Sequence, residues 1–388
     1  MSGPRTLLLS NRNYEKDVWR CGQVEFENVV CAVDDVDVAA PRAVQRTPGR
    51  ALRQVERVTK RAFGLELSYV PRIETIRLRR DYELLCVYVQ GLSDLTVLDA
   101  LPDWRNRCAK AVCFVEEIWV RGLPRWSRRT FEQLAKFDLI ACLQHGSVSP
   151  LAALVGRRCE WLPPGVDALR FFPGLVPPPR TIDVYAMGRH SERTHRALLE
   201  HATLRDWTYL FDTLEVRRVR GGDHMQHRTQ LAELVKRSRY FLANRGRVDR
   251  WGDTGQQEEL GFRSFEGAAG GAVLIGDAPR GEHVRTLFDW PDAHIHVPFD
   301  STIMPEVIAA LDAEPERVAR IRQNNVVQSL RRHDWVYRFR SALEWLKLAP
   351  TERLRQRTQR LGELATFSER AAPWIRAGLP VARALDAD

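Results

Sequence analysis

The sequence has no long hydrophobic run and few cysteines. No apolar stretch approaches the roughly 18 residues that a membrane-spanning helix needs, and the apolar core of the first ten residues is too short for a signal peptide. We therefore expect a cytoplasmic protein. The seven cysteines include no C-x-x-C pair, and most lie among apolar residues. Their spacing excludes a zinc ribbon or a disulfide framework, and buried, reduced thiols are expected instead.

Acidic residues are too few to balance the basic ones. The 59 lysines and arginines exceed the 50 aspartates and glutamates, which leaves a net charge of +9. Such a charge suits an anionic partner: a phosphorylated ligand, a nucleic acid or the acidic inner face of a membrane, where peripheral contact stays open. The chain contains no recognisable reading helix or base-stacking platform, so we expect no nucleic-acid partner.

Apolar residues, by contrast, are plentiful, at 44% of 388 residues, which predicts two domains with cores of their own. Short apolar runs alternate with helical patterns along most of the chain, as in parallel α/β sheets. Strands are predicted at residues 6–10, 29–33, 83–89, 111–115, 139–143 and 158–162, and again at residues 182–187, 208–211, 240–243, 273–275 and 294–297.

A proline-rich segment separates the two series of strands. Residues 172–180 hold four prolines, which favours a stiff, extended linker. Near the end of the sequence, Trp335, Phe339 and Leu343 recur at four-residue spacing and predict a packing helix. We therefore predict two doubly wound, Rossmann-like domains followed by helices that cross over them. The predicted boundaries are residues 1–170 for the first domain, 171–180 for the linker, 181–345 for the second domain and 346–388 for a helical extension.

The most informative stretch is residues 255–276, whose pattern predicts a loop, a helix, a tight turn and a strand. Gly261 directly precedes the helix, so a ligand can approach the backbone there. The free amides of Phe262, Arg263 and Ser264, with the arginine side chain, would form an anion site at the helix start. A capped helix with small residues for close packing is an equally open alternative.

Two glutamates flank this anion site. Glu266 lies in the first turn of the predicted helix, where the helix dipole favours a carboxylate. We expect its side chain to face the ligand and to accept hydrogen bonds from the two hydroxyls of a ribose. Glu258 stands eight residues earlier, on the preceding loop, from which it could reach the same ligand.

A second basic cluster follows the first strand of the second domain. Ligands of open parallel sheets bind beyond the carboxyl ends of the strands, so Gly188 and Arg189 are placed to meet a diphosphate. Arg193 lies four residues further and shares that face if a helix has begun. Ordinary surface arginines are the competing interpretation.

These motifs resemble those of the retaining GT-B glycosyltransferases, the group-one nucleotide-sugar transferases. The spacing of Glu258 and Glu266 resembles the E-x7-E motif of that family. Leu162-Pro-Pro-Gly165-Val-Asp167 resembles its N-G-V-D element, and Gly188-Arg189 matches the G-R that opens its second domain. The loop E-E-L-G-F-R-S-F-E is most similar to a bacterial branch of the spore-coat maturation type.

The resemblance implies a GT-B fold, in which two Rossmann-like domains face a cleft and the second domain holds a nucleoside diphosphate sugar. It also implies that Glu258 is catalytic. Two departures matter: Thr194 occupies the position of a family lysine, so we assign the second phosphate contact to Arg193, and Pro163 and Pro164 replace the usual residues before Gly165. The implied donor-binding residues are Gly188, Arg189, Arg193, Gly261, Phe262, Arg263, Ser264 and Glu266.

On the acceptor side, Glu116 and Glu117 directly follow a predicted strand. One of them would be exposed to the cleft, where a carboxylate orients a sugar hydroxyl or acts as a base; capping and surface roles are equally open. Asp34, Asp35 and Asp37 come closest to an acidic metal motif, and we interpret them as an exposed turn. Arginines and helix amides can stabilise a departing diphosphate alone, so we expect neither a metal nor another cofactor.

The sequence thus predicts a metal-independent glycosyltransferase that moves a hexose from a UDP- or GDP-linked sugar to a glycan, lipid-linked or protein acceptor. A nucleotide-sugar-binding or structural protein that keeps the fold without turnover is the alternative.

Overall fold

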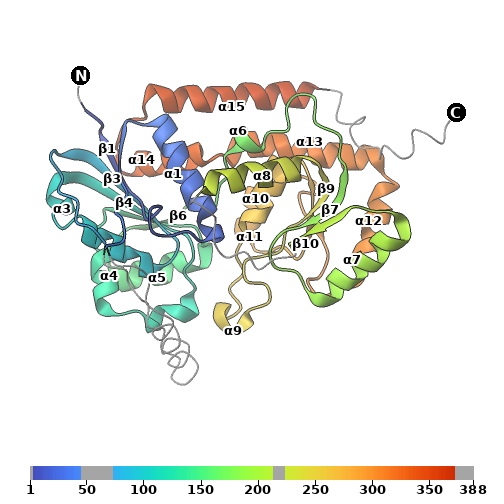
Figure 1. Ribbon diagram of the computed structural model, residues 1–388, viewed down its shortest axis with the longest axis horizontal. Helices are drawn as coiled ribbons and strands as arrows, with labels where there is room; N and C mark the ends of the chain where they lie inside the picture. The colour runs from blue at the N-terminus through green and yellow to red at the C-terminus, as the bar shows by residue number, and fades with distance from the viewer. Residues whose placement is uncertain (1–2, 45–72, 213–222, 372–388) are drawn as a thin grey trace.

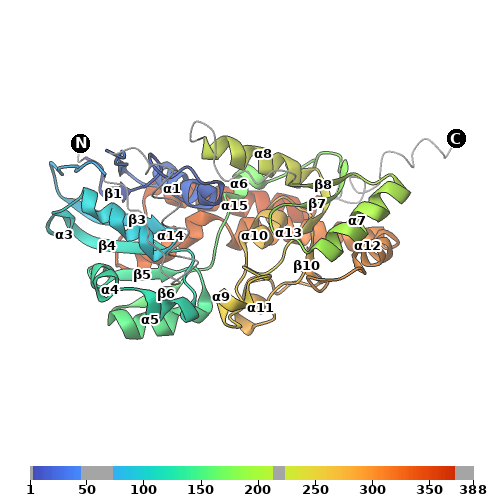
Figure 2. The same cartoon turned by 60° about the horizontal axis from the view of Figure 1, so that its bottom comes forward.

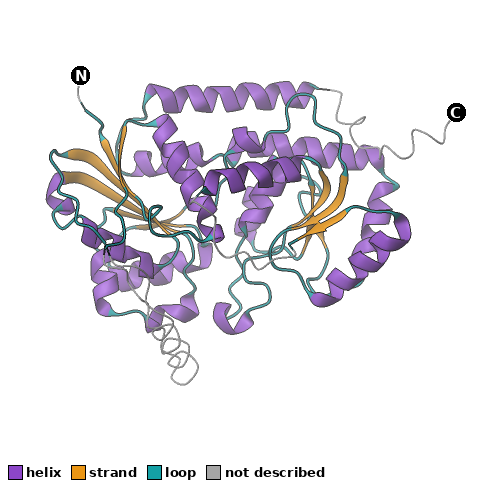
Figure 3. Ribbon diagram, in the orientation of Figure 1, coloured by secondary structure: helices purple, strands orange, loops and turns teal. Residues whose placement is uncertain are grey.

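The computed structural model describes residues 3–44, 73–212 and 223–371. It consists of two α/β domains, each built around one parallel sheet with helices on both sides (Figures 1 and 3). This confirms the predicted fold class. A third layer of helices, at the end of the chain, crosses from the second domain back to the first.

The first domain contains a six-stranded sheet in the order β2-β1-β3-β4-β5-β6. Its strands are β1 (Thr6–Leu9), β2 (Val36–Ala39), β3 (Tyr82–Val89), β4 (Cys108–Val115), β5 (Leu139–Cys142) and β6 (Cys159–Trp161). Its helices are α1 (Cys21–Val33), α3 (Trp104–Arg107), α4 (Arg128–Leu134), α5 (Val148–Val155) and α6 (Ala168–Phe171).

One predicted strand of this domain is wrong. Residues 29–33 form the last turns of helix α1, and the strand is β2, three residues further on. Helix α1 contacts β3 as well as α8, α14 and α15, so it is buried on several faces. Its sequence therefore lacks the one-sided pattern of a surface helix and resembles a buried strand.

The second domain contains a five-stranded sheet in the order β11-β10-β9-β7-β8. Its strands are β7 (Ile182–Ala186), β8 (Tyr209–Phe211), β9 (Ser238–Leu242), β10 (Val273–Gly276) and β11 (Ile295–His296). Its helices are α7 (Glu192–Arg205), α8 (His224–Lys236), α9 (Trp251–Thr254), α10 (Phe262–Ala269), α11 (Glu282–Leu287), α12 (Met304–Asp312) and α13 (Pro315–Arg332).

Two final helices tie the domains together. Helix α14 (Trp335–Trp345) packs on α1 and β5 of the first domain, and α15 (Glu352–Arg370) runs across both domains, at the top of Figure 1. The predicted boundary at residue 345 assigns α14 to the second domain, whereas its packing places it on the first. Trp335 of α14 stacks edge-on against Phe26, with ring centres 5.3 Å apart. The apolar core is consequently continuous between the domains.

The turned view shows the side on which the loops of the two domains meet (Figure 2). Helix α9 of the second domain contacts residues 120–125 of the first. Among the described residues, no helix is both long enough and apolar enough to cross a membrane.

Candidate functional site

The second sheet reverses its strand order at β7, which has β8 on one side and β9 on the other. In such sheets a ligand binds at the carboxyl ends of the two strands that flank the reversal. The loop after β7 contains Gly188, whose φ of 88° is the left-handed region that glycine tolerates. Its amide donates to Asp212 at 2.9 Å.

Arg189 connects the two loops at this reversal. Its guanidinium forms an ion pair with Asp249, in the loop after β9, at 2.9 Å. The two side chains are 45% and 37% exposed, so the pair contributes little to stability and can exchange Asp249 for another anion. Arg189 thus lies at the carboxyl edge of the second sheet, and its contact with a diphosphate stays a prediction.

Helix α10 begins at the same edge. Gly261 is its N-cap, and a β-carbon there would lie 3.1 Å from the carbonyl oxygen of Asn244, in the loop after β9. The amide of Gly246 also donates to the carbonyl of Glu259 at 2.8 Å. The start of α10 therefore lies beside the carboxyl end of β9, where its first amides can meet an anion.

Glu258 lies beside the loops after β9 and β10. Its carboxylate is 3.4 Å from Arg245, which also pairs with Asp277 at 2.9 Å. It further accepts a hydrogen bond from the amide of Arg280 at 3.4 Å. The carboxylate is about one-third exposed and lies beside Arg245 near the carboxyl edge of the second sheet.

Glu266, in contrast, is buried, with 1% of its surface exposed, which differs from the expected free carboxylate facing the ligand. One of its oxygens accepts from Arg228 of α8 and the other accepts from Arg263. Burial by itself would raise the pKa of Glu266, but the two arginines overcome that effect and lower it to about 2. Contact with a ribose stays a prediction.

Phe262 and Ser264 also turn their side chains inward. Phe262 packs against Gly22 of α1, where a β-carbon would lie 2.8 Å from its ring, and against Trp335. The Ser264 hydroxyl is 3.0 Å from a ring nitrogen of His294. The backbone amide of Ser264 is also engaged, since it donates to the carbonyl of Gly261 at 3.2 Å. The side chain of Arg263, by contrast, is 28% exposed.

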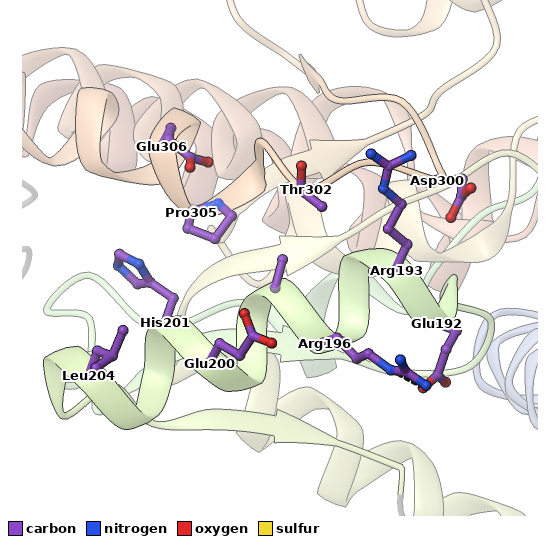
Figure 4. Close-up of a pocket in the computed structure, with 11 residues that line it drawn as sticks. Glu192, Arg193, Arg196, Glu200, His201, Leu204, Asp300, Thr302, Pro305 and Glu306 are labelled. Carbon is purple, nitrogen blue, oxygen red and sulfur yellow. Dashed lines mark hydrogen bonds and ion pairs between the residues drawn. The ribbon is translucent and has the colours of Figure 1, made fainter.

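Arg193 lies elsewhere. It is exposed on α7 and, in Figure 4, points toward Asp300 at the rim of a cavity of about 630 Å³ between α7 and the start of α12. The lining residues do not include Gly188, Arg189 or Arg263. The neighbouring Thr194, at the position of the family lysine, is buried and binds the backbone of residues 299 and 301. Helix α7 has already begun at Glu192, which directs Arg193 away from Arg189.

The first domain contributes two carboxylates directly after β4. Glu116 accepts a hydrogen bond from the Tyr88 hydroxyl at 2.9 Å. Burial, with the neighbouring charge of Glu117, raises the pKa of Glu116 to about 8, although the hydrogen bond from Tyr88 opposes the shift. Glu117 forms an ion pair with Arg247 of the second domain. Glu116 therefore has a raised pKa, and Glu117 reaches across the interface to the second domain.

The loop before α10 also crosses to the first domain. Glu259, which is almost fully buried, accepts the backbone amides of His145 and Gly146 at 2.9 and 2.8 Å. Gln257 accepts the amide of Val120 at 3.1 Å. The glutamate loop and the loops after β4 and β5 are therefore fixed to each other, and the candidate donor edge faces the first domain.

The three aspartates near the start of β2 are ion-paired, not a simple exposed turn. Asp34 is buried and pairs with Arg5 at 2.8 Å, while Asp35 pairs with Arg353 and Asp37 with Arg80. Asp34 and Asp35 precede β2 and Asp37 is its second residue, so all three lie at the amino end of this strand, opposite to the carboxyl edge of the sheet. Within residues 3–44, 73–212 and 223–371, no group of three or more His, Cys, Asp or Glu side chains is arranged to hold a metal ion.

Several residues of this region were not predicted, among them Arg228, Arg245, Arg247 and Glu259. A local signal exists for two of them, because Arg245 and Arg247 directly follow the apolar strand β9, as Arg189 follows β7. Arg228 lies inside a helix, 203 residues from its partner Glu25, and no local pattern indicates that contact.

Comparison with known proteins agrees with this geometry. Residues 180–344 match the family model described as glycosyl transferase-like. Among solved structures, the chain is similar to HepE of Anabaena in complex with UDP-glucose, with a TM-score of 0.50 and 12% identity over 88% of this chain and 99% of that one. No curated protein matches the sequence.

Two further structures are more distant. A glycosylation-associated protein complex from Streptococcus agalactiae has a TM-score of 0.38 at 10% identity over 72% of this chain and 54% of that one. A variant of TarM from S. aureus has a TM-score of 0.44 at 8% identity over 67% of this chain and 55% of that one. The chain spans about half of each of these proteins.

The two parallel sheets, the crossing helices and the likeness to HepE establish the fold. The chain has the GT-B architecture, and residues 180–344 are similar to the glycosyl transferase-like family.

Proposed function

We propose that the protein transfers a hexose from a UDP- or GDP-linked sugar to a hydroxyl group of a glycan, lipid-linked or protein acceptor, with retention at the anomeric carbon. The observation that carries this proposal is the joint position of Arg189, Arg263 and the start of α10 at the carboxyl edge of a glycosyl transferase-like domain. The UDP-glucose bound to HepE supports a nucleotide sugar as the donor.

The leaving diphosphate carries the charge that must be stabilised when the glycosidic bond to the donor breaks. Arg189 would exchange Asp249 for a phosphate oxygen, and Arg263 with the first amides of α10 would bind the other phosphate. These donors are fixed before the ligand arrives, so they need no metal ion. We propose that Glu258, on the adjoining loop, contacts the donor sugar.

The acceptor would approach from the first domain. Glu116 binds the Tyr88 hydroxyl and has a pKa of about 8, so below that pH it is neutral and can donate a hydrogen bond to an acceptor oxygen. Above that pH it becomes a carboxylate that can accept the proton of the attacking hydroxyl. Glu117, paired with Arg247, would hold the acceptor side against the donor domain.

A titration with nucleotide sugars tests this proposal. UDP-glucose and GDP-mannose are added separately, and thermal unfolding is followed. A ligand at 100 times its dissociation constant stabilises the fold by about 2.7 kcal/mol. Stabilisation by one nucleotide sugar, followed by release of its sugar to water or to an added acceptor, supports the proposal. No stabilisation by any nucleoside diphosphate sugar would contradict it.

A binding protein without turnover is the second candidate, favoured by one observation. Both oxygens of Glu266, which the family resemblance assigns to the donor, are occupied by arginines. The same titration separates the candidates, since a binding protein is stabilised by the nucleotide sugar yet releases neither the nucleoside diphosphate nor the sugar.

A further inference from the structure

Glu25 of α1 is a buried carboxylate at which the elements that join the two domains meet. Its oxygens accept the amide of Asp167, just before the linker, at 2.8 Å and the indole N–H of Trp335, on the crossing helix α14, at 3.2 Å. They also accept two hydrogen bonds from Arg228, of the second domain, at 2.7 and 3.0 Å. Glu25 therefore links the first domain to the linker, to the crossing helix and to helix α8.

The chain of contacts continues to the candidate donor site. The third nitrogen of Arg228 donates to Glu266 of α10, and the other oxygen of Glu266 accepts from Arg263. Glu25, Arg228, Glu266 and Arg263 thus form a line of alternating charges, which we call the ion-pair chain. The first three are buried, and only Arg263 reaches solvent.

The net charge of the ion-pair chain is zero, and each of its residues changes the electrostatic potential at the next. In surroundings from which water is excluded, such pairs interact far more strongly than they would at the surface. An anion next to Arg263 experiences the attraction of both arginines and the repulsion of both glutamates. The strength with which Arg263 binds an anion therefore depends on charges that are not in contact with it.

We propose that Glu25 and Arg228 are positioning residues of the donor site, which set the affinity of Arg263 for a diphosphate through Glu266. This inference rests on the proposed function, because it takes the diphosphate of the donor as the ligand of Arg263. It also gives Glu266 a role of its own: the carboxylate joins two arginines, and both of its oxygens are used in doing so.

The ion-pair chain predicts that replacing Arg228 and replacing Glu25 change anion binding in opposite directions. Replacing Arg228 removes a positive charge and leaves Arg263 as the sole cationic partner of Glu266, so anion binding weakens. Replacing Glu25 with glutamine removes a negative charge but leaves a side chain of the same size, so anion binding strengthens. A purely structural role predicts no such reversal, because loss of packing or order weakens binding in both variants.

The experiment measures the affinity of the full chain for two ligands by calorimetric titration. Inorganic diphosphate has no ribose, so it reports on the phosphate contacts alone, and UDP-glucose reports on the complete donor. The variants are Arg228→Met and Glu25→Gln. Arg239→Met is the matched control, since Arg239 is also a buried arginine between two carboxylates, Asp183 and Asp312, but within the second domain.

For both ligands we expect about tenfold weaker binding in Arg228→Met, about fivefold tighter binding in Glu25→Gln and unchanged binding in folded Arg239→Met. If Arg228→Met does not fold, the tighter binding of Glu25→Gln still decides the matter, because a structural role predicts the reverse. Wild-type affinity in Glu25→Gln, or weaker binding there, overturns the inference while the proposed function stands. If wild-type protein binds neither ligand, the proposed function fails and takes this inference with it.

Discussion

The ion pairs Glu25–Arg228 and Glu117–Arg247 both join the two domains, and their surroundings differ. Glu25–Arg228 lies beside the linker and is almost fully buried, with exposed fractions of 0% and 3%. Glu117–Arg247 lies between loops and is about one-third exposed on both sides. A buried pair cannot exchange its partners for water, whereas an exposed pair can. The first pair therefore fixes the domains where the chain crosses between them, and the second can break and re-form when ligands enter or leave.

The largest expected effect comes from breaking the buried pair. Arg228→Met leaves Glu25 without its cationic partner and Glu266 with only one, so the free energy of unfolding should fall by about 3–5 kcal/mol. Urea denaturation at pH 7 measures this loss. A loss below about 1 kcal/mol would show that the pair behaves like a surface pair, and the contrast between the two bridges would disappear.

Removing the arginines of the donor edge should affect binding more than folding. Arg189→Ala and Arg263→Ala each remove a charge-assisted hydrogen bond to the diphosphate, at a cost of about 1.5–3 kcal/mol in donor binding. The free energy of unfolding should change much less in Arg189→Ala, because its partner Asp249 is exposed. Calorimetric titration with the nucleoside diphosphate sugar checks this, and normal affinity in both variants would place the donor elsewhere.

Glu116 should make stability depend on pH in a sense opposite to Glu266. Its pKa is about 8 in the folded protein against an ordinary value of 4.5, so the folded state holds a proton that the unfolded state releases. Its contribution to stability is therefore present below pH 4.5 and is lost as the pH rises toward 8. Glu116→Gln should remove part of this decline in melting temperature between pH 5 and pH 8, which thermal unfolding across that range measures. An identical decline in the variant would mean that another group titrates.

Breaking the exposed pair Glu117–Arg247 should have the smallest effect among the substitutions. Arg247→Met should lower the free energy of unfolding by about 0.2–1 kcal/mol, and added salt should reduce the difference further. Denaturation at low and high ionic strength tests this. A loss as large as that of Arg228→Met would mean that the two bridges are equivalent.

Removing divalent metal ions with a chelator should leave the activity unchanged. Arginines and backbone amides supply the positive charge at the donor edge, so transfer or hydrolysis of the donor sugar should persist in EDTA. Activity that disappears with EDTA and returns with magnesium or manganese would show that the diphosphate needs a cation as well.

The sequence was sufficient to predict the strands of both sheets except β2, because a strand buried on both faces is a short apolar run between polar loops. It failed at residues 29–33, where helix α1 is buried on most sides and even its polar residues Gln23, Glu25 and Glu27 are buried. Two positions of the candidate donor edge followed from the local sequence, because Arg189 comes soon after the end of β7 and Gly261 directly precedes α10.

The state of Glu266 could not be predicted in the same way. A carboxylate in the first turn of a helix is compatible with a ligand and with a buried ion pair, and the local sequence is identical in both cases. The difference lies in Arg228 and Glu25, which approach Glu266 only after α1 and α8 have packed together. The position of the Arg193 side chain could not be predicted for a related reason. The exact residue at which α7 begins decides which way this side chain points.

The return of the final helices has a consequence for the order of events during synthesis. Strand β1 receives part of its surroundings from the far end of the chain: Arg5 donates to the carbonyl of Ala349 at 2.7 Å, and Arg353 pairs with Asp35, next to β2. Residues next to β1 must therefore wait until residues 349–353 have been synthesised before their surroundings are complete. A nascent chain arrested before residue 335 should expose the apolar face of α1 and should depend on chaperones, although every strand of both sheets has by then been made.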